Sequence, residues 1–199
     1  MFDVGANVGA HSKIFLDLGA KVIAIEPNDT LNKNFKNFNK NLTLVNVAVG
    51  SKNDEKELMM YSECGHNTLI QNSPKVVEYA FLGKKKVKIV PLITLIKKYG
   101  VPKFMKIDVE LYEFEVLSTL NEAKSLPKFI KFEYNPHLTG ELLKIGENCL
   151  DLLDKLGYKF NYSKGTVHLL KFKEFVEKEQ LKEKLNKERI FCDVYASLI

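Results

Sequence analysis

The first dozen residues constrain the fold most, because they are typical of a strand, a glycine turn and the start of a helix. The stretch runs Asp3-Val4-Gly5-Ala6-Asn7-Val8-Gly9-Ala10-His11-Ser12. A glycine in such a turn can take positive φ and lets a ligand approach the backbone where a Cβ would obstruct it. The free N–H groups of the following helix would point at a bound anionic or polar group. The stretch therefore predicts a loop that holds a cofactor.

The spacing of the glycines favours one class of cofactor. Dinucleotide sites use G-x-G-x-x-G to seat a pyrophosphate on the helix end, whereas here Asp3 stands before Gly5 and Gly9 in the pattern Asp-x-Gly-x-x-x-Gly. An acid at that place would repel a pyrophosphate but attract the ammonium group of an amino-acid moiety. The next strand ends at Glu26, 17 residues after Gly9, where a carboxylate can accept both hydroxyls of a ribose. The two acids indicate S-adenosylmethionine rather than NAD, with a degenerate dinucleotide loop as the alternative.

Length and composition indicate one ordinary globular domain over residues 1–199. The chain has a hydrophobic share of 45% and no linker rich in Pro, Gly or Ser. No apolar run reaches the roughly 18 to 20 residues of a membrane span, and Met1 leads straight into a strand rather than a signal peptide. The three cysteines lack the spacing of a zinc site and are expected to be reduced thiols. We therefore expect a cytoplasmic protein; the oligomeric state cannot be read from the sequence.

The net charge of +5 raises the question of nucleic-acid binding. Arg189 is the only arginine, and all other basic residues are lysines. Arginine supplies the bidentate contacts to phosphate and guanine, so its near absence argues against a base-reading surface. The cluster Lys84-Lys85-Lys86-Val87-Lys88 is expected to be a solvated turn that enters a strand.

Strands and helices alternate along the chain, which predicts an α/β fold with a doubly wound parallel sheet. Expected strands are residues 2–4, 21–26, 43–49, 104–109, 129–134, 158–162, 166–171 and 193–199. Helices are expected near 11–18, 31–39, 94–99, 112–120, 140–156 and 174–188. Residues 56–91 do not form a clean βα unit. Short strands at 58–61 and 87–90 flank a polar loop there, with a short helix expected over 74–81. In such a sheet, ligands bind beyond the carboxyl ends of the strands at the topological switch point.

Three blocks in this order resemble a known family. They are Phe2 to Gly9, then Ile25-Glu26-Pro27, then Lys106-Ile107-Asp108-Val109-Glu110 with Tyr112-Glu113 behind. The chain is similar over most of its length to the FkbM-type S-adenosylmethionine-dependent methyltransferases. The resemblance implies a Rossmann-like class I methyltransferase fold, a mostly parallel seven-stranded sheet with helices on both faces, in which the last strand, 193–199, is antiparallel.

The resemblance also implies where the cofactor binds and what is methylated. Besides Asp3, Gly5, Asn7, Gly9, Glu26 and Asp108, it points to Asn46, Val47 and Ala48 beside the adenine and to Asn67 and Thr68 at the methionine end. His66 is a weaker candidate in the same loop. The implied acceptors are hydroxyls of sugars, glycans or other small molecules.

The chemistry expected is methyl transfer to a hydroxyl, for which a base must draw off the hydroxyl proton. Asp108 is the first candidate, with Glu110 or Glu133 in support and His137 as the alternative. Residues two apart on an extended segment point the same way, so Asp108 and Glu110 could both face the pocket. No assured metal-ligand spacing is present, although these three carboxylates at one sheet edge could hold a divalent cation.

One residue departs from the family pattern, which usually has glycine at the position of Leu111. A leucine there would strain a left-handed turn or fill space meant for the substrate. Two other interpretations therefore stay open. One is a cofactor-binding module of the same fold that has lost activity, and the other is an NAD(P)-dependent dehydrogenase.

Overall fold

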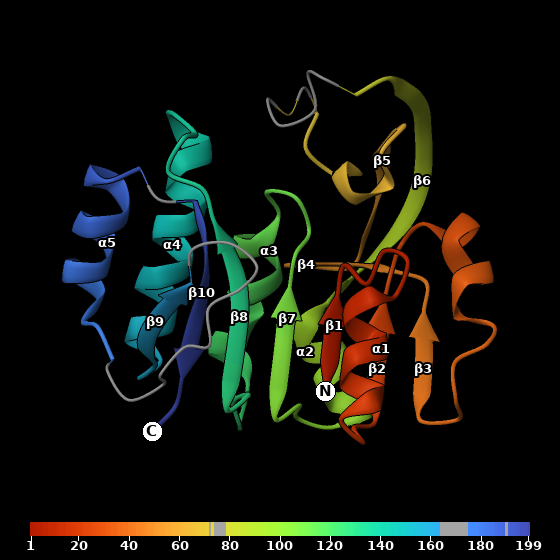
Figure 1. The fold of residues 1–199 in the computed structure, drawn as a ribbon, viewed down its shortest axis with the longest axis horizontal. Helices are drawn as coiled ribbons and strands as arrows, with labels where there is room; N and C mark the ends of the chain where they lie inside the picture. Colours follow the sequence, from red (N-terminus) through yellow and green to blue (C-terminus); the bar gives the residue numbers. More distant parts are fainter. Residues whose placement is uncertain (72, 74–78, 164–174, 190) are drawn as a thin grey trace.

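A seven-stranded sheet organises the computed structural model, which describes residues 1–71, 73, 79–163, 175–189 and 191–199. Its strand order is β3-β2-β1-β7-β8-β10-β9 (Figure 1). The strands are β1 (Phe2–Val4), β2 (Val22–Ile25), β3 (Leu42–Val45), β7 (Phe104–Ile107), β8 (Phe129–Tyr134), β9 (Lys159–Ser163) and β10 (Cys192–Ser197). All pairs from β3 to β8 are parallel, and β10 pairs antiparallel with both β8 and β9. The expected doubly wound sheet with an antiparallel last strand is confirmed.

Helices cover both faces of this sheet. In Figure 1, α1 (Ala10–Asp17) lies in front of the strands, and α2 (Leu92–Tyr99), α3 (Glu113–Leu117) and α4 (Glu141–Lys155) lie behind them. The last helix, α5 (Lys178–Lys187), packs on α4. Short 3-10 turns are η1 (Asp29–Phe35), η2 (Cys64–His66) and η4 (Ser118–Glu122). Among the described helices, none is both long enough and apolar enough to cross a membrane.

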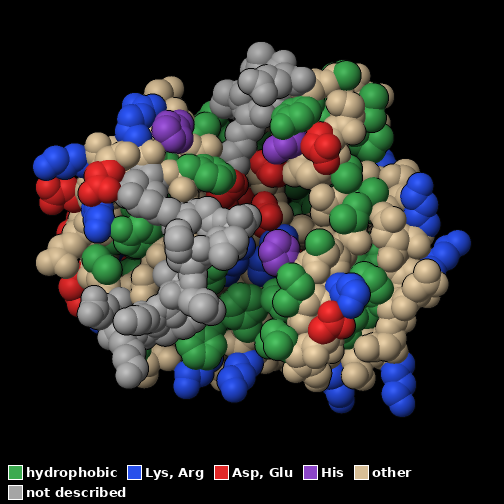
Figure 2. All heavy atoms as spheres, viewed as in Figure 1, with side chains coloured by type: hydrophobic (Ala, Val, Ile, Leu, Met, Phe, Trp, Pro, Cys, Tyr) green, Lys and Arg blue, Asp and Glu red, His purple; other side chains and the backbone are tan. Residues whose placement is uncertain are grey.

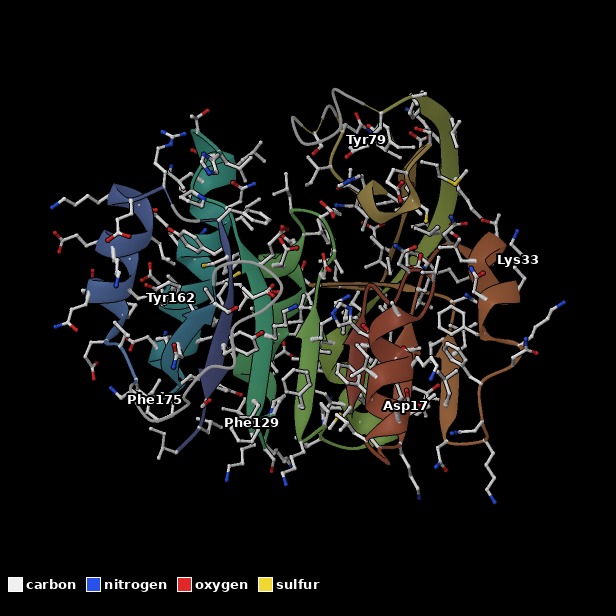
Figure 3. All side chains as sticks on the ribbon, viewed as in Figure 1. Asp17, Lys33, Tyr79, Phe129, Tyr162 and Phe175 are labelled. Atoms are coloured by element: carbon white, nitrogen blue, oxygen red, sulfur yellow. The ribbon has the colours of Figure 1, made fainter. Side chains whose placement is uncertain are left out.

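Strand β8 shows why the two faces of the sheet differ. Ile130, Phe132 and Tyr134 are fully buried on the face covered by α3 and α4. The alternate residues Phe129, Lys131 and Glu133 are only half-buried and face the α1 side. Side chains alternate along a strand, so these three residues lie on one face. They change from the aromatic ring of Phe129 at the amino end of the strand, labelled in Figure 3, to the charged Glu133 at its carboxyl end. Polar groups thus gather at one edge of the sheet on the α1 side.

A second, three-stranded sheet stands beside the carboxyl edge of the first. It has the order β4-β6-β5 and consists of β4 (Ala48–Gly50), β5 (Asp54–Tyr61) and β6 (Phe81–Pro91). β5 and β6 form a long antiparallel pair that rises above the carboxyl ends of β1 and β2 (Figure 1). The strands expected at 58–61 and 87–90 are therefore parts of longer ones. The lysine cluster lies within β6, where Lys84 and Lys86 are exposed and pair with Glu57 and Glu55 of β5.

Two expected elements differ in the structure. The strand expected over 43–49 is broken, because the chain turns at Asn46 and Val47 and its second half, β4, pairs with β6. The helix expected over 31–39 is the 3-10 turn η1, where the Asn28 side chain accepts the Thr30 N–H at 3.2 Å. Asparagine is a poor helix former, and Asn32, Asn34 and Asn37 fall in this segment.

The other helix ends shift by only a few residues, since α3 gives way to η4 after Leu117 and α5 begins at Lys178. The strand expected over 166–171 lies outside the described residues, as do residues 74–78 of the short helix expected over 74–81. Phe81, at the end of that range, begins β6 instead.

Close packing of α4 on β8 gives a test of the fold. A Cβ at Gly146 would lie 2.6 Å from the ring of Tyr134, which is fully buried and donates a hydrogen bond from its hydroxyl to Asn186 Oδ1 at 2.7 Å. Gly146→Ala should lower the free energy of unfolding by about 1–3 kcal/mol, despite the better helix propensity of alanine. Urea unfolding followed by circular dichroism measures this. Asn148→Ala, at an exposed position of the same helix, should leave the midpoint unchanged or raise it; equal stability of both variants would refute the packing argument.

Candidate functional site

An open cavity of about 250 Å³ lies at the carboxyl ends of β1, β2 and β7. β1 is the strand between β2 and β7, so the cavity sits at the switch point of the sheet. Figure 2 shows a hollow near the centre of this view, where acidic, basic and histidine side chains come together. Polar and apolar residues both line the cavity, among them Gly5, Asn7, His11, Glu26, Val47, Ala48, Val49, Leu58, Cys64, Asn67, Leu69, Lys106, Asp108 and Glu110.

The glycine turn forms the floor of the cavity. Gly5 and Gly9 have φ of 75° and 85°, and Asn7 between them has φ of 49°. The N–H groups of Gly5 and Ala6 both donate to the carbonyl of Ile25 at the end of β2. A Cβ at Gly5 would lie only 1.8 Å from the backbone oxygen of Asp108. The turn is therefore pressed between β2 and β7, and only glycine fits its first position.

Glu26 follows β2 directly and lines the cavity although it is only 6% exposed. Its Oε1 accepts the N–H of Asn28 and its Oε2 accepts the N–H of Asn7, each at 2.8 Å. Burial raises the pKa of Glu26, while these two backbone hydrogen bonds act in the opposite direction. The carboxylate is thus fixed in place, and each oxygen keeps acceptor capacity for a ligand hydroxyl.

Asp3 was expected to contact an ammonium group, but the structure places it below the cavity. It is fully buried; its Oδ2 accepts the Ser12 hydroxyl at 2.6 Å and its Oδ1 lies 3.3 Å from Lys106 Nζ. Lys106 is 2% exposed and donates to the Gly5 carbonyl at 2.7 Å. Burial by itself would lower the pKa of Lys106, but Asp108 and Asp3 outweigh it and the pKa is raised. The charge of Asp3 is therefore matched inside the protein.

Three carboxylates meet where β7 and β8 end. Asp108, Glu110 and Glu133 each bring one oxygen within 4.8 Å of the others, which is a geometry that could hold a cation. Asp108 also lies 3.4 Å from Lys106 Nζ, and its side chain is 41% exposed. Glu110 and Leu111 both have positive φ, 53° and 75°, so the strained turn expected at Leu111 is present. The leucine side chain is buried, and it lies beside Glu133 rather than in the cavity.

The wall opposite the sheet comes from the second sheet and its loop. Val47, Ala48, Val49, Leu58 and Leu69 make it largely apolar. Asn67 accepts the Tyr61 N–H at 2.9 Å through its side chain, and the Cys64 thiol donates to Asn7 Oδ1 at 3.1 Å. Above this wall His66 stacks on Tyr79, which Figure 3 labels, with ring centroids 4.3 Å apart.

Besides Asp3 and His66, five of the candidate residues do not line the cavity. Gly9 is packed under Phe35 and Phe38. Asn46 is exposed and donates to the Glu26 carbonyl at 3.1 Å, and Thr68 is buried and donates to the Glu110 carbonyl at 2.6 Å. Both hold backbone that shapes the cavity. Glu133 reaches the acidic cluster from β8, and His137 is exposed on the loop beyond it.

Two basic residues that line the cavity, His11 and Lys106, were not among the candidates. Lys106 was expected only as part of a strand and His11 only as the start of a helix. No local sequence signal marks Lys106, because the groups that it contacts, Asp3 and the Gly5 carbonyl, lie about a hundred residues earlier in the chain. Neither residue could be placed beside the cavity without the fold.

Comparison with known proteins agrees with this geometry. A family model described as the methyltransferase FkbM domain matches residues 3–160. The structure resembles the FkbM methyltransferase from Methylobacillus flagellatus KT (TM-score 0.56, 16% identity, covering 98% of this chain and 42% of that one). It also resembles the Dnmt2 methyltransferase of S. pombe (TM-score 0.51, 12% identity, covering 99% of this chain and 48% of that one). The chain thus spans less than half the length of these two structures, and at such identities they show the shared fold. No match was found among curated proteins.

Substitutions at two glycines distinguish the cost of backbone strain from the cost of a steric clash in the turn. Gly5 and Gly19 both have positive φ, 75° and 80°, but a Cβ at Gly19 would meet nothing within 4 Å. Gly19→Ala should therefore cost only about 1–2 kcal/mol of stability. Gly5→Ala must also displace the Asp108 carbonyl, so the thermal midpoint should fall much further. Equal loss of thermal midpoint in the two variants, measured by scanning calorimetry, would show that the contact with β7 is unimportant.

The buried ion pair makes a second prediction. Lys106→Met leaves Asp3 buried without its cation, which should cost about 3–5 kcal/mol of unfolding free energy. Adding Asp3→Asn removes the stranded charge, so the double variant should be more stable than Lys106→Met alone. Chemical denaturation of the wild type, both single variants and the double variant gives the coupling between the two residues. A double variant no more stable than Lys106→Met would contradict the pairing.

Proposed function

The chain belongs to the FkbM methyltransferase family, and from this premise we propose that it transfers a methyl group from S-adenosylmethionine to a hydroxyl of a sugar or other small molecule. The observation that carries the proposal is the place of Glu26. Its carboxylate is held by two backbone amides at the end of β2 and lines the cavity. A fixed acceptor pair at this place suits the two hydroxyls of a ribose.

The rest of the cavity fits the other parts of the same cofactor. The apolar wall of Val47, Val49 and Leu58 suits an adenine ring. The glycine turn allows close approach of the methionine portion to the backbone. Asp3 is already paired with Lys106, so we assign the ammonium group to Asp108, whose carboxylate is 41% exposed. When bound, the cofactor would supply a methyl group on a sulfonium, which is a good leaving group.

The protein's own contribution is then to hold two reactants in line and to remove a proton. Alignment of bound reactants can lower a barrier by several kcal/mol, on the order of 7–11 in the best cases. The acceptor would lie at the edge where Asp108 and Glu110 face the cavity, because that edge adjoins the place proposed for the methionine portion. Carboxylates there can accept hydrogen bonds from a hydroxylated acceptor and orient it.

Binding measurements test the cofactor. S-adenosylhomocysteine, which carries no transferable methyl group, should bind the wild type in a calorimetric titration, whereas NAD should not. Glu26→Ala should weaken that binding by about tenfold or more, because charge-assisted hydrogen bonds to the ribose are lost. Glu57→Ala, which removes a carboxylate on the exposed part of β5, should bind as the wild type does. Tight NAD binding, or full affinity in Glu26→Ala, would count against the proposal.

Transfer is tested separately from binding. The wild type would be incubated with S-adenosylmethionine labelled in the methyl group and a panel of glycosides, polyols, phenols and amines. We expect label in one or more hydroxyl acceptors and none in the amines. Binding without transfer to any member of the panel would favour an inactive binding module, and label in amines alone would refute the hydroxyl assignment.

A further inference from the structure

A row of charged side chains crosses the α1 side of the sheet next to the cavity. Asp3 pairs in register with Lys106 on the neighbouring strand, and Lys106 pairs with Lys131 on the next. Residues paired in register on adjacent strands project from the same face. Asp3 bonds to Ser12 of α1, so the row faces that helix. Lys131 is held in the row by Asp193 at 2.8 Å.

His11 stands over this row. It belongs to the first turn of α1, is half-buried and lines the cavity. Four charged groups influence the pKa of His11: Lys106 and Lys131 lower it, and Asp3 and Asp108 raise it. Burial lowers the pKa of His11, and the two lysines lower it further against the opposing pull of the two acids. The imidazole is therefore neutral at neutral pH and able to accept a proton.

The carboxylate first expected to act as base is less suited to that role. Asp108 lies 3.4 Å from the buried ammonium of Lys106, so its carboxylate is already engaged in an ion pair. In the proposed function it also holds the ammonium group of the cofactor. Glu133 does not line the cavity, and His137 is exposed outside it.

We propose that His11, which lines the cavity above the row of Asp3, Lys106 and Lys131, is the general base of the reaction, with Lys106 and Lys131 as positioning residues beside it. The inference rests on the proposed function. As the acceptor oxygen bonds to the methyl carbon, the carbon–sulfur bond breaks and its electron pair stays on sulfur. The hydroxyl proton passes to the free imidazole nitrogen of His11 and then to solvent. The products are the methyl ether, S-adenosylhomocysteine and one proton.

The first measurement separates a base from a cofactor anchor. His11→Gln keeps a polar side chain of similar reach but cannot take up the proton. It should bind S-adenosylhomocysteine within about threefold of the wild type, as should Lys13→Gln at an exposed site on the same helix. A loss of tenfold or more in His11→Gln alone would show that His11 holds the cofactor, and would overturn the assignment as base.

The second measurement needs no acceptor. The imidazole of His11 is titrated by NMR in histidine-labelled protein saturated with S-adenosylhomocysteine, with His11→Gln used to assign its signal. The midpoint should lie below the ordinary value of about 6.5, and Lys131→Met should raise it. A midpoint at or above 6.5, or one that Lys131→Met leaves unchanged, would overturn the proposal.

The third measurement uses an acceptor from the labelled panel. His11→Gln should lower kcat by about 100-fold or more at pH 7 with little change in KM for S-adenosylmethionine. The wild-type kcat should rise with pH to a plateau that is reached below neutral pH, and this step should be absent in His11→Gln. An active wild type matched by His11→Gln would overturn this inference alone. A wild type that binds no S-adenosylhomocysteine would overturn the proposed function and, with it, the role of His11.

Discussion

The buried ammonium of Lys106 ties together the parts of the molecule that form the site. It reaches the carbonyl of Gly5 in the turn, the carboxylate of Asp3 below it and the carboxylate of Asp108 beside it. Removing such charges from water costs several kcal/mol for each ion, and only close partners recover that cost. The glycine turn therefore keeps its shape because one strand supplies a cation at the position where the neighbouring strand supplies an anion.

Much of the fold could be predicted from the sequence, because it depends on local signals. Apolar strands, glycines after helices and the Asp-x-Gly-x-x-x-Gly turn predicted a doubly wound parallel sheet, and the family resemblance implied the antiparallel last strand; both are present. The strand expected over 129–134 has the bounds of β8, whose alternating burial repeats every two residues. Glu26 was predicted to lie at the site because it ends the strand that follows the glycine turn and its helix. In a doubly wound sheet that strand end lies beside the turn.

What could not be predicted depends on partners far apart in the chain. Lys106 binds a carbonyl 101 residues away, and no local pattern tells such a lysine from a solvated one. For the same reason Asp3 was assigned to a ligand, although its partner is that lysine. The break between β3 and β4 was missed because the run 43–49 is nearly continuously apolar, with Asn46 at the break itself. Strand β4 turns aside to pair with β6, which begins more than 30 residues later in the chain.

Two energetically unfavourable features, a strained backbone turn and a cluster of like charges, lie together at the carboxyl ends of β7 and β8. Contacts with the surrounding residues stabilise them. Glu110 and Leu111 both have positive φ, which costs on the order of 1–3 kcal/mol for each residue. The Glu110 carbonyl is held by the buried hydroxyl of Thr68 at 2.6 Å, and Leu111 recovers part of the cost by burying its side chain. Because the backbone is bent there, the Glu110 carboxylate approaches Asp108 and Glu133 despite their like charge. Relaxing this turn would separate the carboxylates, so the strain is consistent with an edge selected to hold a polar ligand rather than for stability alone.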